Sequence, residues 1–545
     1  MLLVFLSAIL LIPTLSGVGK LFENIFRTQI FDGISGKILI GIFSVSLIWT
    51  IIAFFVPLNI YVEIPTVLLG LFYFFKEKIY LDFYKFPKKD RLLIAAGLVV
   101  ILFCGSFYPY ILDHFGYYLP TLQWLKDYGL VKGISNLDPL LGQMSIWHIL
   151  QVGFSNFSDP FLRINSILLI IYLLYIVEKK TWIQLCFIPI LLLFSQSPSP
   201  DLPVIIFSLI ILNEILSGNK TATTLFAFSV FVFAIKPTMI WVPVLCFLYS
   251  LFIVKSSLKI LIPGIFILFL FFIKNIWTFG YPVFPVSILD FGFSWKPDAE
   301  LLKTSSEFAV QKTFDNQYSF AEIQKFSWFD YVKNWLFLDG IKSFINILFI
   351  ISLMIFIIFS FIKRNKIITF ICISLIAKSI LVLSFSAQYR FFIDVFFVVI
   401  FVMLFDFFTK RKFILMYSFL TVIFVAFITF PTFVKRYVPS YRMSSFMGPF
   451  EKKQLYKPSL YEFNKFDSFE IGNLKFNVSE RYPFNFDTPL PAISKDFIFD
   501  YQKAGIFPQL INKNDMRKGF ISKKLTEAEK KQLKNIVTKI KNSYK

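Results

Sequence analysis

Residues 342–362 read KSFINILFIISLMIFIIFSFI, a run dominated by Ile, Phe and Leu. A helix of about 20 residues crosses the roughly 30 Å hydrocarbon core of a bilayer, so a run of this length and composition predicts a membrane-spanning helix. Similar apolar blocks recur from residue 1 to residue 431 of the 545-residue chain. We therefore expect an all-α polytopic membrane protein.

The overall composition supports this class and excludes a soluble globular protein. Hydrophobic residues make up 57% of the chain and charged residues 16%, whereas about a quarter of the residues in soluble domains are charged. The net charge of +21 does not indicate nucleic-acid binding. Much of it lies in short loops between apolar blocks, as the positive-inside rule predicts, and no nucleic-acid-binding module is present.

The apolar blocks predict about fourteen spans. Six basic loops then fall on one side of the membrane, which marks the inside and leaves the loops 110–159 and 277–341 and the tail 432–545 outside. The predicted spans are 2–18, 38–58, 61–75, 92–109, 160–177, 181–196, 201–217, 221–235, 238–254, 259–276, 342–362, 367–386, 391–408 and 413–431.

This predicted membrane topology divides the chain into three regions. Residues 1–91 form N-terminal transmembrane helices, and residues 92–431 form a transmembrane core that carries the two external loops. Residues 432–545, in which basic residues outnumber acidic ones, form a small external C-terminal domain.

Three external segments have the pattern of helices. From Pro120 to Tyr128, a proline suits the first turn and Gly129 suits a C-terminal cap. The segment 142–154 is apolar but too short and polar to span, so we expect it on the membrane surface. A third helix is expected over 526–541, where Thr526 and Glu529 have the spacing of a capping box.

Asp113 directly follows a predicted span and is flanked by aromatic residues. A carboxylate at the membrane boundary can act as general base towards a hydroxyl group. Tyr117 and Trp124 follow at spacings that share one helical face if the helix is continuous, and their rings can hold a sugar or a lipid head group. An interfacial Asp beside an aromatic belt explains the same residues without a catalytic role.

Four more charged residues fall at the external ends of predicted spans: Asp201, Lys236, Lys274 and Arg390. A phosphate leaving group in a water-poor cleft needs cationic stabilisation, and Arg offers bidentate contact. Taken singly, Lys and Arg here also suit snorkelling anchors, and Asp201 suits a helix cap. Their presence on the side of Asp113 favours a phosphate site.

The external loop 277–341 mixes aromatic and polar residues. Its rings Phe293, Trp295, Trp328 and Trp335 suit contact with the faces of sugars. We expect this loop to cover the site as a partly mobile lid.

The run DHFGYYLPTLQWLKDYGLVKGISNL over residues 113–137 resembles the first external loop of GT-C fold glycosyltransferases. These polytopic enzymes take a sugar from a polyprenyl-phosphate carrier, and mannosyl- and aminoarabinosyl-transferring families belong to them. The run is more narrowly similar to a bacterial group of membrane proteins with the same Asp…Tyr…Pro…Trp…Gly…Asn-Leu pattern. A second patch, KNIWTFGYPVFP over residues 274–285, resembles a later span end and loop of that group. The resemblance covers roughly residues 90–410.

The first motif departs from many GT-C enzymes, which carry a second acidic residue beside or two after the catalytic Asp. Here His114 and Phe115 follow Asp113. The departure leaves Asp113 to act alone or with Asp201. We therefore expect no metal ligand set and no cofactor, with a divalent cation left open.

The resemblance implies an inverting glycosyltransferase of the bacterial inner membrane that acts on the periplasmic face. Asp113 is then the base that deprotonates the acceptor, and the donor is a polyprenyl-phosphate sugar. The acceptor is a glycan, a lipid or a protein. The expected substrate-binding residues are Asp201, Lys236, Lys274, Arg390, Tyr117 and Trp124.

Two other classes compete with this interpretation. One is a transporter or flippase for a lipid-linked glycan, which is expected to show polar residues near mid-bilayer. The other is a non-catalytic scaffold for envelope assembly, which needs no site at all.

Overall fold

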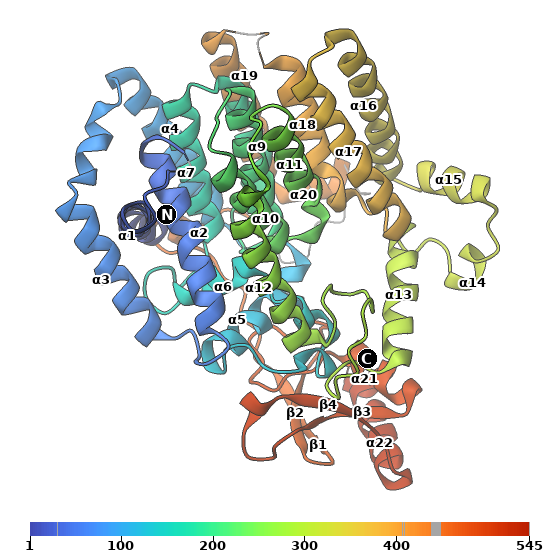
Figure 1. Ribbon diagram of the computed structural model, residues 1–545. Coiled ribbons are helices and arrows are strands. Elements are labelled where there is room, and N and C mark those ends of the chain that lie inside the picture. The colour runs from blue at the N-terminus through green and yellow to red at the C-terminus, as the bar shows by residue number, and fades with distance from the viewer. Residues whose placement is uncertain (30, 406, 408, 438–447, 544–545) are drawn as a thin grey trace.

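The computed structural model describes residues 1–29, 31–405, 407, 409–437 and 448–543. Residues 406 and 408 of the predicted span 391–408, and residues 438–447 and 544–545 of the predicted tail, therefore lie outside the described residues. The described chain forms a bundle of apolar helices with a smaller mixed region, built by the C-terminal residues, at one end (Figure 1).

Six helices in the described residues are long and apolar enough to cross a membrane. Several of their bounds lie close to the predicted ones, which confirms a mostly helical chain with helices of membrane length. The six are α1 (Leu2–Phe26), α2 (Gly33–Ile52), η8 (Leu258–Ile260) continuing into α12 (Leu261–Phe279), α16 (Ile341–Lys363), α17 (Lys366–Phe385) and α19 (Lys410–Thr429).

Shorter apolar helices fill the bundle between them. The predicted span 181–196 is not one continuous α-helix: it divides into η5 (Trp182–Phe187), α8 (Ile188–Leu191) and η6 (Leu192–Phe194). Pro189 contributes to this break because it has no N–H for a helical hydrogen bond. The other short helices are α3 (Ile60–Lys76), α4 (Lys88–Gly105), α7 (Ile164–Lys179), α9 (Asp201–Leu216), α10 (Ala222–Ile235), α11 (Trp241–Phe252), α18 (Ile393–Leu404) and α20 (Pro431–Tyr437).

The loop 110–159 folds into short helices at one end of the bundle. The predicted helix is confirmed as α5, and Gly129 after it has a φ of 76°, as a C-terminal cap requires. These elements are the π-helical turn η2 (His114–Tyr118), α5 (Leu119–Asp127), η3 (Ile134–Asn136), η4 (Pro139–Gly142) and α6 (Ile146–Gly153).

The prediction that 142–154 lies on the membrane surface is wrong. Every residue of α6 is buried, and the helix packs against α2 and α5. The polar side chain of Gln151 is accommodated inside the protein, since its Nε2 donates to the Oδ2 of Asp159 at 3.0 Å.

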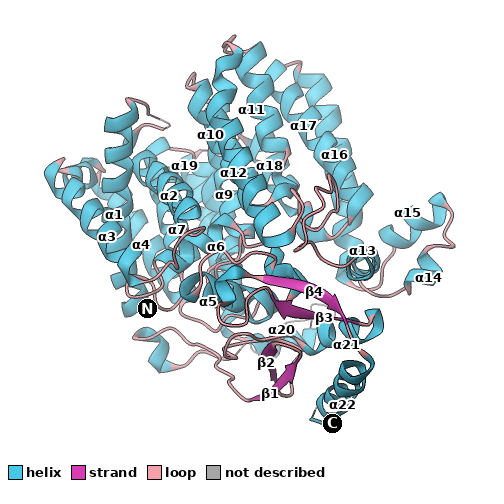
Figure 2. Cartoon of the chain, turned by 60° about the horizontal axis from the view of Figure 1, so that its bottom comes forward, coloured by secondary structure: helices cyan, strands magenta, loops and turns pink. Residues whose placement is uncertain are grey.

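The C-terminal region contains two antiparallel strand pairs, β1 (Phe466–Ile471) with β2 (Leu474–Ser479) and β3 (Ile506–Leu510) with β4 (Phe520–Lys524). Two helices, α21 (Lys495–Ala504) and α22 (Glu527–Ser543), accompany them (Figure 2). The predicted capping box at the start of α22 is confirmed: the backbone N–H of Thr526 donates to the carboxylate of Glu529 at 2.8 Å, and the backbone N–H of Glu529 donates to the hydroxyl of Thr526 at 3.4 Å.

This region is joined to the loop 110–159 by buried hydrogen bonds. The hydroxyl of Tyr501 lies 2.9 Å from the carbonyl oxygen of Asn136 and 3.0 Å from that of Leu137. The backbone N–H of Phe520 donates to the carbonyl of Lys132 at 2.9 Å. The C-terminal region and the loop therefore form one layer at the same end of the bundle.

Within the loop 277–341, the helices α13 (Ala299–Thr313), α14 (Phe320–Ile323) and α15 (Trp328–Leu336) extend from the side of the bundle (Figures 1 and 2). The rings expected in a lid do not gather over one place. Trp295 stacks on Phe293 at 4.4 Å, Trp335 is buried, and Trp328 is 82% exposed.

Candidate functional site

Two carboxylate–cation pairs lie where the loop 110–159 meets the ends of several helices. Arg390, in the short helix η9 (Tyr389–Phe391), places its Nη1 2.8 Å from the Oδ2 of Asp113. Lys236, which ends α10, forms an ion pair with Asp201, the first residue of α9. Asp113 and Arg390 are 33% and 43% exposed, so a ligand can reach this pair.

The two pairs form one cluster. The Nζ of Lys236 lies 3.5 Å from the carbonyl oxygen of Arg390, and both cations lie over the ring of Phe391, at 5.2 and 5.1 Å from its centroid. Burial opposes the charged form of Arg390, but the neighbouring Asp113 and Asp201 outweigh it and raise its pKa. The guanidinium is therefore a permanent cation in the cluster.

Two tyrosines form the buried wall behind Asp113. Tyr118 donates to the hydroxyl of Ser199 at 3.4 Å, and that hydroxyl donates to Asp201 at 3.3 Å. The ring of Tyr117 lies 4.6 Å from that of Tyr118. Burial, reinforced by nearby Asp113, raises the pKa of both tyrosines, so both stay protonated and can act as hydrogen-bond donors.

The two histidines are neutral packing groups near this wall. The ring of His148 lies 4.8 Å from that of Tyr118. Burial lowers the pKa of His148 to about 3, and burial together with Arg163 lowers that of His114 to about 3. Neither histidine carries a charge at neutral pH.

Lys274 and Trp124 lie outside the cluster. The Nζ of Lys274 donates to the carbonyl oxygens of Gln143 and Met144 at 2.8 and 3.1 Å, and the side chain is buried. The ring of Trp124 is fully buried and packs edge-on against Phe520 of β4. The structure thus gives these two predicted site residues packing and hydrogen-bonding contacts instead of access to a ligand.

A second group of charged residues, near Arg390, was not predicted from the sequence. Lys342, at the start of α16, forms an ion pair with Asp315 and lies 5.8 Å from the ring centroid of Tyr389. Burial lowers the pKa of Lys312, at the end of α13, and Lys342 and Arg390 contribute to that shift. A signal existed for Lys342, since it begins a predicted span on the external side, as Lys236 ends one.

A buried ion pair supports the cluster from inside the bundle. Lys378 of α17 pairs with Asp394 of α18, and the Nε1 of Trp241 donates to the other oxygen of Asp394 at 2.9 Å. Asp394 lies four residues after Arg390, so this pair fixes the start of α18 immediately behind the cluster.

The arrangement can bind an anion and can accept a proton. Arg390 and Lys236 are suited to binding phosphate. Of the carboxylates in the two ion pairs, that of Asp113 is more exposed than that of Asp201. No group of three or more His, Cys, Asp or Glu side chains that could hold a metal ion occurs in the described part of the chain.

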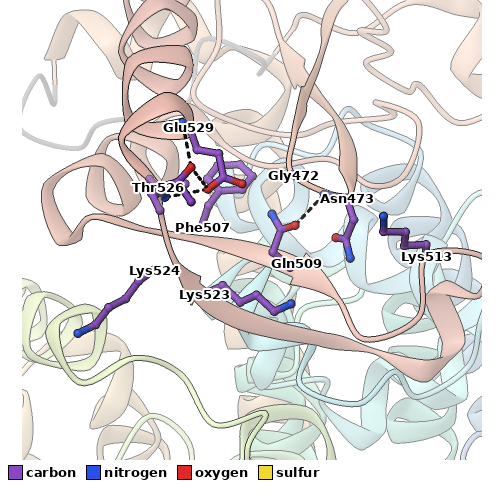
Figure 3. Close-up of a pocket in the computed structure, with 10 residues that line it drawn as sticks. Gly472, Asn473, Phe507, Gln509, Lys513, Lys523, Lys524, Thr526 and Glu529 are labelled. Atoms are coloured by element: carbon purple, nitrogen blue, oxygen red, sulfur yellow. Dashed lines mark hydrogen bonds between the residues drawn. The ribbon is translucent and has the colours of Figure 1, made fainter.

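A separate hollow of about 360 Å³ lies in the C-terminal region, between the β1–β2 turn, the β3–β4 pair and the start of α22 (Figure 3). Phe507 lies at its apolar side, and Gln509 donates to the carbonyl of Ile471 at 3.0 Å. Its basic side chains, which favour anionic groups, are Lys513, Lys523 and Lys524.

The apolar helices indicate a membrane-embedded, mostly helical protein with a polar cluster at one end of its bundle. A family model described as "Domain of unknown function (DUF8201)" matches residues 1–397, and the chain belongs to this family. The match includes all four residues of the cluster and ends before the C-terminal region. No curated protein and no solved structure matches the chain.

Proposed function

We propose that this protein is a membrane glycosyltransferase of the GT-C type that transfers a sugar from a polyprenyl-phosphate carrier to a cell-envelope acceptor. The observation that carries the proposal is the single cluster formed by Asp113, Arg390, Asp201 and Lys236. The cluster combines a solvent-accessible carboxylate with two cations, which is what transfer from a phosphate ester to a hydroxyl requires.

In the proposed reaction, Asp113 removes the proton of the acceptor hydroxyl as its oxygen attacks the anomeric carbon. The bond from that carbon to the carrier phosphate breaks, with inversion at the carbon, and the polyprenyl phosphate leaves with the bonding electrons. Arg390 and Lys236 stabilise the charge that develops on the phosphate. Asp201 orients Lys236 through their ion pair, and Tyr117 borders the sugar.

The Nη1 of Arg390 donates a hydrogen bond to Asp113. A guanidinium carries five N–H donors in a planar fork. Arg390 can therefore contact phosphate oxygens through its other donors while it still lies beside Asp113. Lys274 and Trp124, which are buried, act in this proposal only by supporting the loop 110–159 and its junction with the C-terminal region.

We propose further that the shorter apolar helices complete about fourteen spans in the bacterial inner membrane. The cluster and the C-terminal region then face the periplasm. The positive-inside distribution of the short loops supports this orientation. The acceptor is a glycan, a lipid or a protein, and the basic hollow beside α22 offers a place for an acidic acceptor.

The proposal is tested by deleting the gene in the host and complementing it with the wild type or with Asp113→Asn at equal abundance. Mass spectrometry of envelope glycans should show a sugar that disappears on deletion and returns only with the wild type. The polyprenyl-phosphate sugar should accumulate, exposed to an impermeant reagent at the outer leaflet. Unchanged envelope glycans in the Asp113→Asn strain would refute the enzyme and leave a scaffold role.

A flippase for a lipid-linked glycan is the second candidate, and the buried Lys378–Asp394 pair favours it, since ion pairs inside transmembrane helices often mark transport paths. In that case the lipid-linked sugar should accumulate at the inner leaflet, protected from the impermeant reagent until the membrane is permeabilised. The side of accumulation thus separates the two functions.

A further inference from the structure

α15 lies away from the bundle (Figures 1 and 2), and it carries two exposed aromatic side chains. Trp328 is 82% exposed and Phe329 is 67% exposed. Large aromatic side chains that stand free at one edge of a short helix are costly in water, so they indicate a surface that something else covers.

The rest of α15 shows the two-sided pattern of an amphipathic helix. Asp330, Lys333 and Asn334 occupy one side at helical spacing, and the apolar residues occupy the other. Part of the apolar side is already used inside the protein, since Trp335 is buried. Trp328 and Phe329 form the part that remains uncovered by the described chain.

The position of α15 in the chain identifies what covers this edge. Only four residues separate it from α16, which is long and apolar enough to cross a membrane. The first turns of α16 expose large apolar side chains, with Phe344 66% exposed and Leu348 40% exposed. The start of α16 therefore lies at a membrane surface, where Trp and amphipathic helices concentrate.

We propose that α15 is an interfacial helix whose edge formed by Trp328 and Phe329 inserts into the head-group region of the bilayer leaflet at the start of α16. One acidic and one basic residue, Asp330 and Lys333, balance the charge of its polar side. The binding therefore depends on apolar burial and is insensitive to salt and to the head-group charge of the lipid.

The interfacial helix also connects the membrane surface to the loop that carries Arg390. The Nε1 of Trp335 donates to the carbonyl oxygen of Ala387 at 2.9 Å, three residues before Arg390. The Nδ2 of Asn346 in α16 donates to the carbonyl oxygen of Trp335 at 2.8 Å. These two bonds place the cluster around Arg390 near the level of the lipid head groups. This inference does not depend on the proposed transfer reaction.

The test uses the full chain in vesicles of phosphatidylcholine with and without phosphatidylglycerol. A nitroxide label is attached to a cysteine introduced as Trp328→Cys or, as the matched control on the polar side, Lys333→Cys. Both positions are exposed, so neither label disturbs packing. The four native cysteines are buried, and the unsubstituted protein treated with the same reagent gives their background.

The accessibility of each label to oxygen, which partitions into lipid, is compared with its accessibility to a water-soluble nickel chelate. The label at 328 should favour oxygen by several-fold and the label at 333 should favour nickel, with no change on adding salt or removing phosphatidylglycerol. Equal or greater nickel accessibility at 328 would overturn the inference. Strong dipolar broadening at 328 that disappears on dilution into excess unlabelled protein would also overturn it, because a second copy of the chain would then be the occupant.

Discussion

Replacing Arg390 with Ala and Asp113 with Asn should separate two roles within one ion pair. A hydrogen bond to a charged group contributes about 1.5–3 kcal/mol. Because the side chain of Arg390 is 43% exposed, water screens part of its attraction for phosphate, so the lower part of that range applies. Arg390→Ala should therefore weaken donor binding by about 1.5–2 kcal/mol, which is roughly 10- to 30-fold in affinity.

Asp113→Asn should act on the other step. Removal of the proton acceptor should lower turnover by on the order of 10²–10⁴. Its half-exposed pair with Arg390 is worth only about 0.2–1 kcal/mol, and the substitution frees the guanidinium and removes a negative charge near the phosphate. Donor affinity should therefore stay the same or tighten by up to roughly fivefold.

The assay combines equilibrium binding of a polyprenyl-phosphate sugar to the protein in nanodiscs with a single-turnover rate. Asp290→Asn, an exposed carboxylate paired with Lys296, and Arg364→Ala, at the opposite end of α16, are the matched controls and should change neither quantity. Arg390→Lys should restore only part of the affinity, because bidentate geometry is lost.

Three results would contradict these roles. Donor affinity that survives Arg390→Ala would remove the phosphate role of that residue. Loss of donor binding in Asp113→Asn would show that the carboxylate supports the site and is not the base. Equal, mild losses in both variants would indicate interfacial anchors.

Further predictions concern stability and topology. Lys378→Met should destabilise the protein by about 3–5 kcal/mol, because it leaves Asp394 buried without its partner; the double variant with Asp394→Leu should recover most of the lost Tm. Burial raises the pKa of Asp138 from 3.8 to about 7, so its contribution to stability is fully present below pH 3.8 and is lost as the pH rises from there through about 7. Asp138→Asn should remove that pH-dependent loss. If the wild type and the variant gave identical curves of Tm against pH, this prediction would be contradicted. A cysteine at Lys513 in the C-terminal region should react with an impermeant maleimide in intact cells, and one at Lys220, between α9 and α10, only after permeabilisation; the reverse pattern would invert the proposed orientation.

Helices whose existence depends on length and composition alone were predictable from the sequence. The span predicted at 367–386 is α17 at Lys366–Phe385, which is long enough to cross a membrane. The apolar block at 221–235 is the helix α10 at Ala222–Ile235, one of the shorter apolar helices. The location of α6 was not predictable, because the same apolar periodicity suits a helix on a membrane surface and a helix inside a protein. Only the packing of α6 on α2 and α5 decides between the two.

The gathering of Asp113, Asp201, Lys236 and Arg390 at one end of the bundle was predictable, but the depth and rotation of individual site residues were not. The predicted topology placed Lys236 and Lys274 at the same end of the bundle. In the structure, however, the Nζ of Lys274 donates hydrogen bonds to two backbone carbonyls. The π-helical turn η2 explains the misplacement of Trp124. It inserts one residue into the helical repeat, which rotates the following helix by about 100° and turns Trp124 away from the face of Asp113 and Tyr117.

The contact between Asp113 and Arg390 joins residues 277 positions apart, and no local pattern in one sequence can pair them. Under the proposed mechanism this contact has a geometric consequence. Arg390 holds one carboxylate oxygen of Asp113, Oδ2, and its remaining N–H donors are available to the donor phosphate. The other carboxylate oxygen of Asp113 is then the one that accepts the proton of the acceptor hydroxyl. The same guanidinium therefore fixes the base and the leaving phosphate relative to each other.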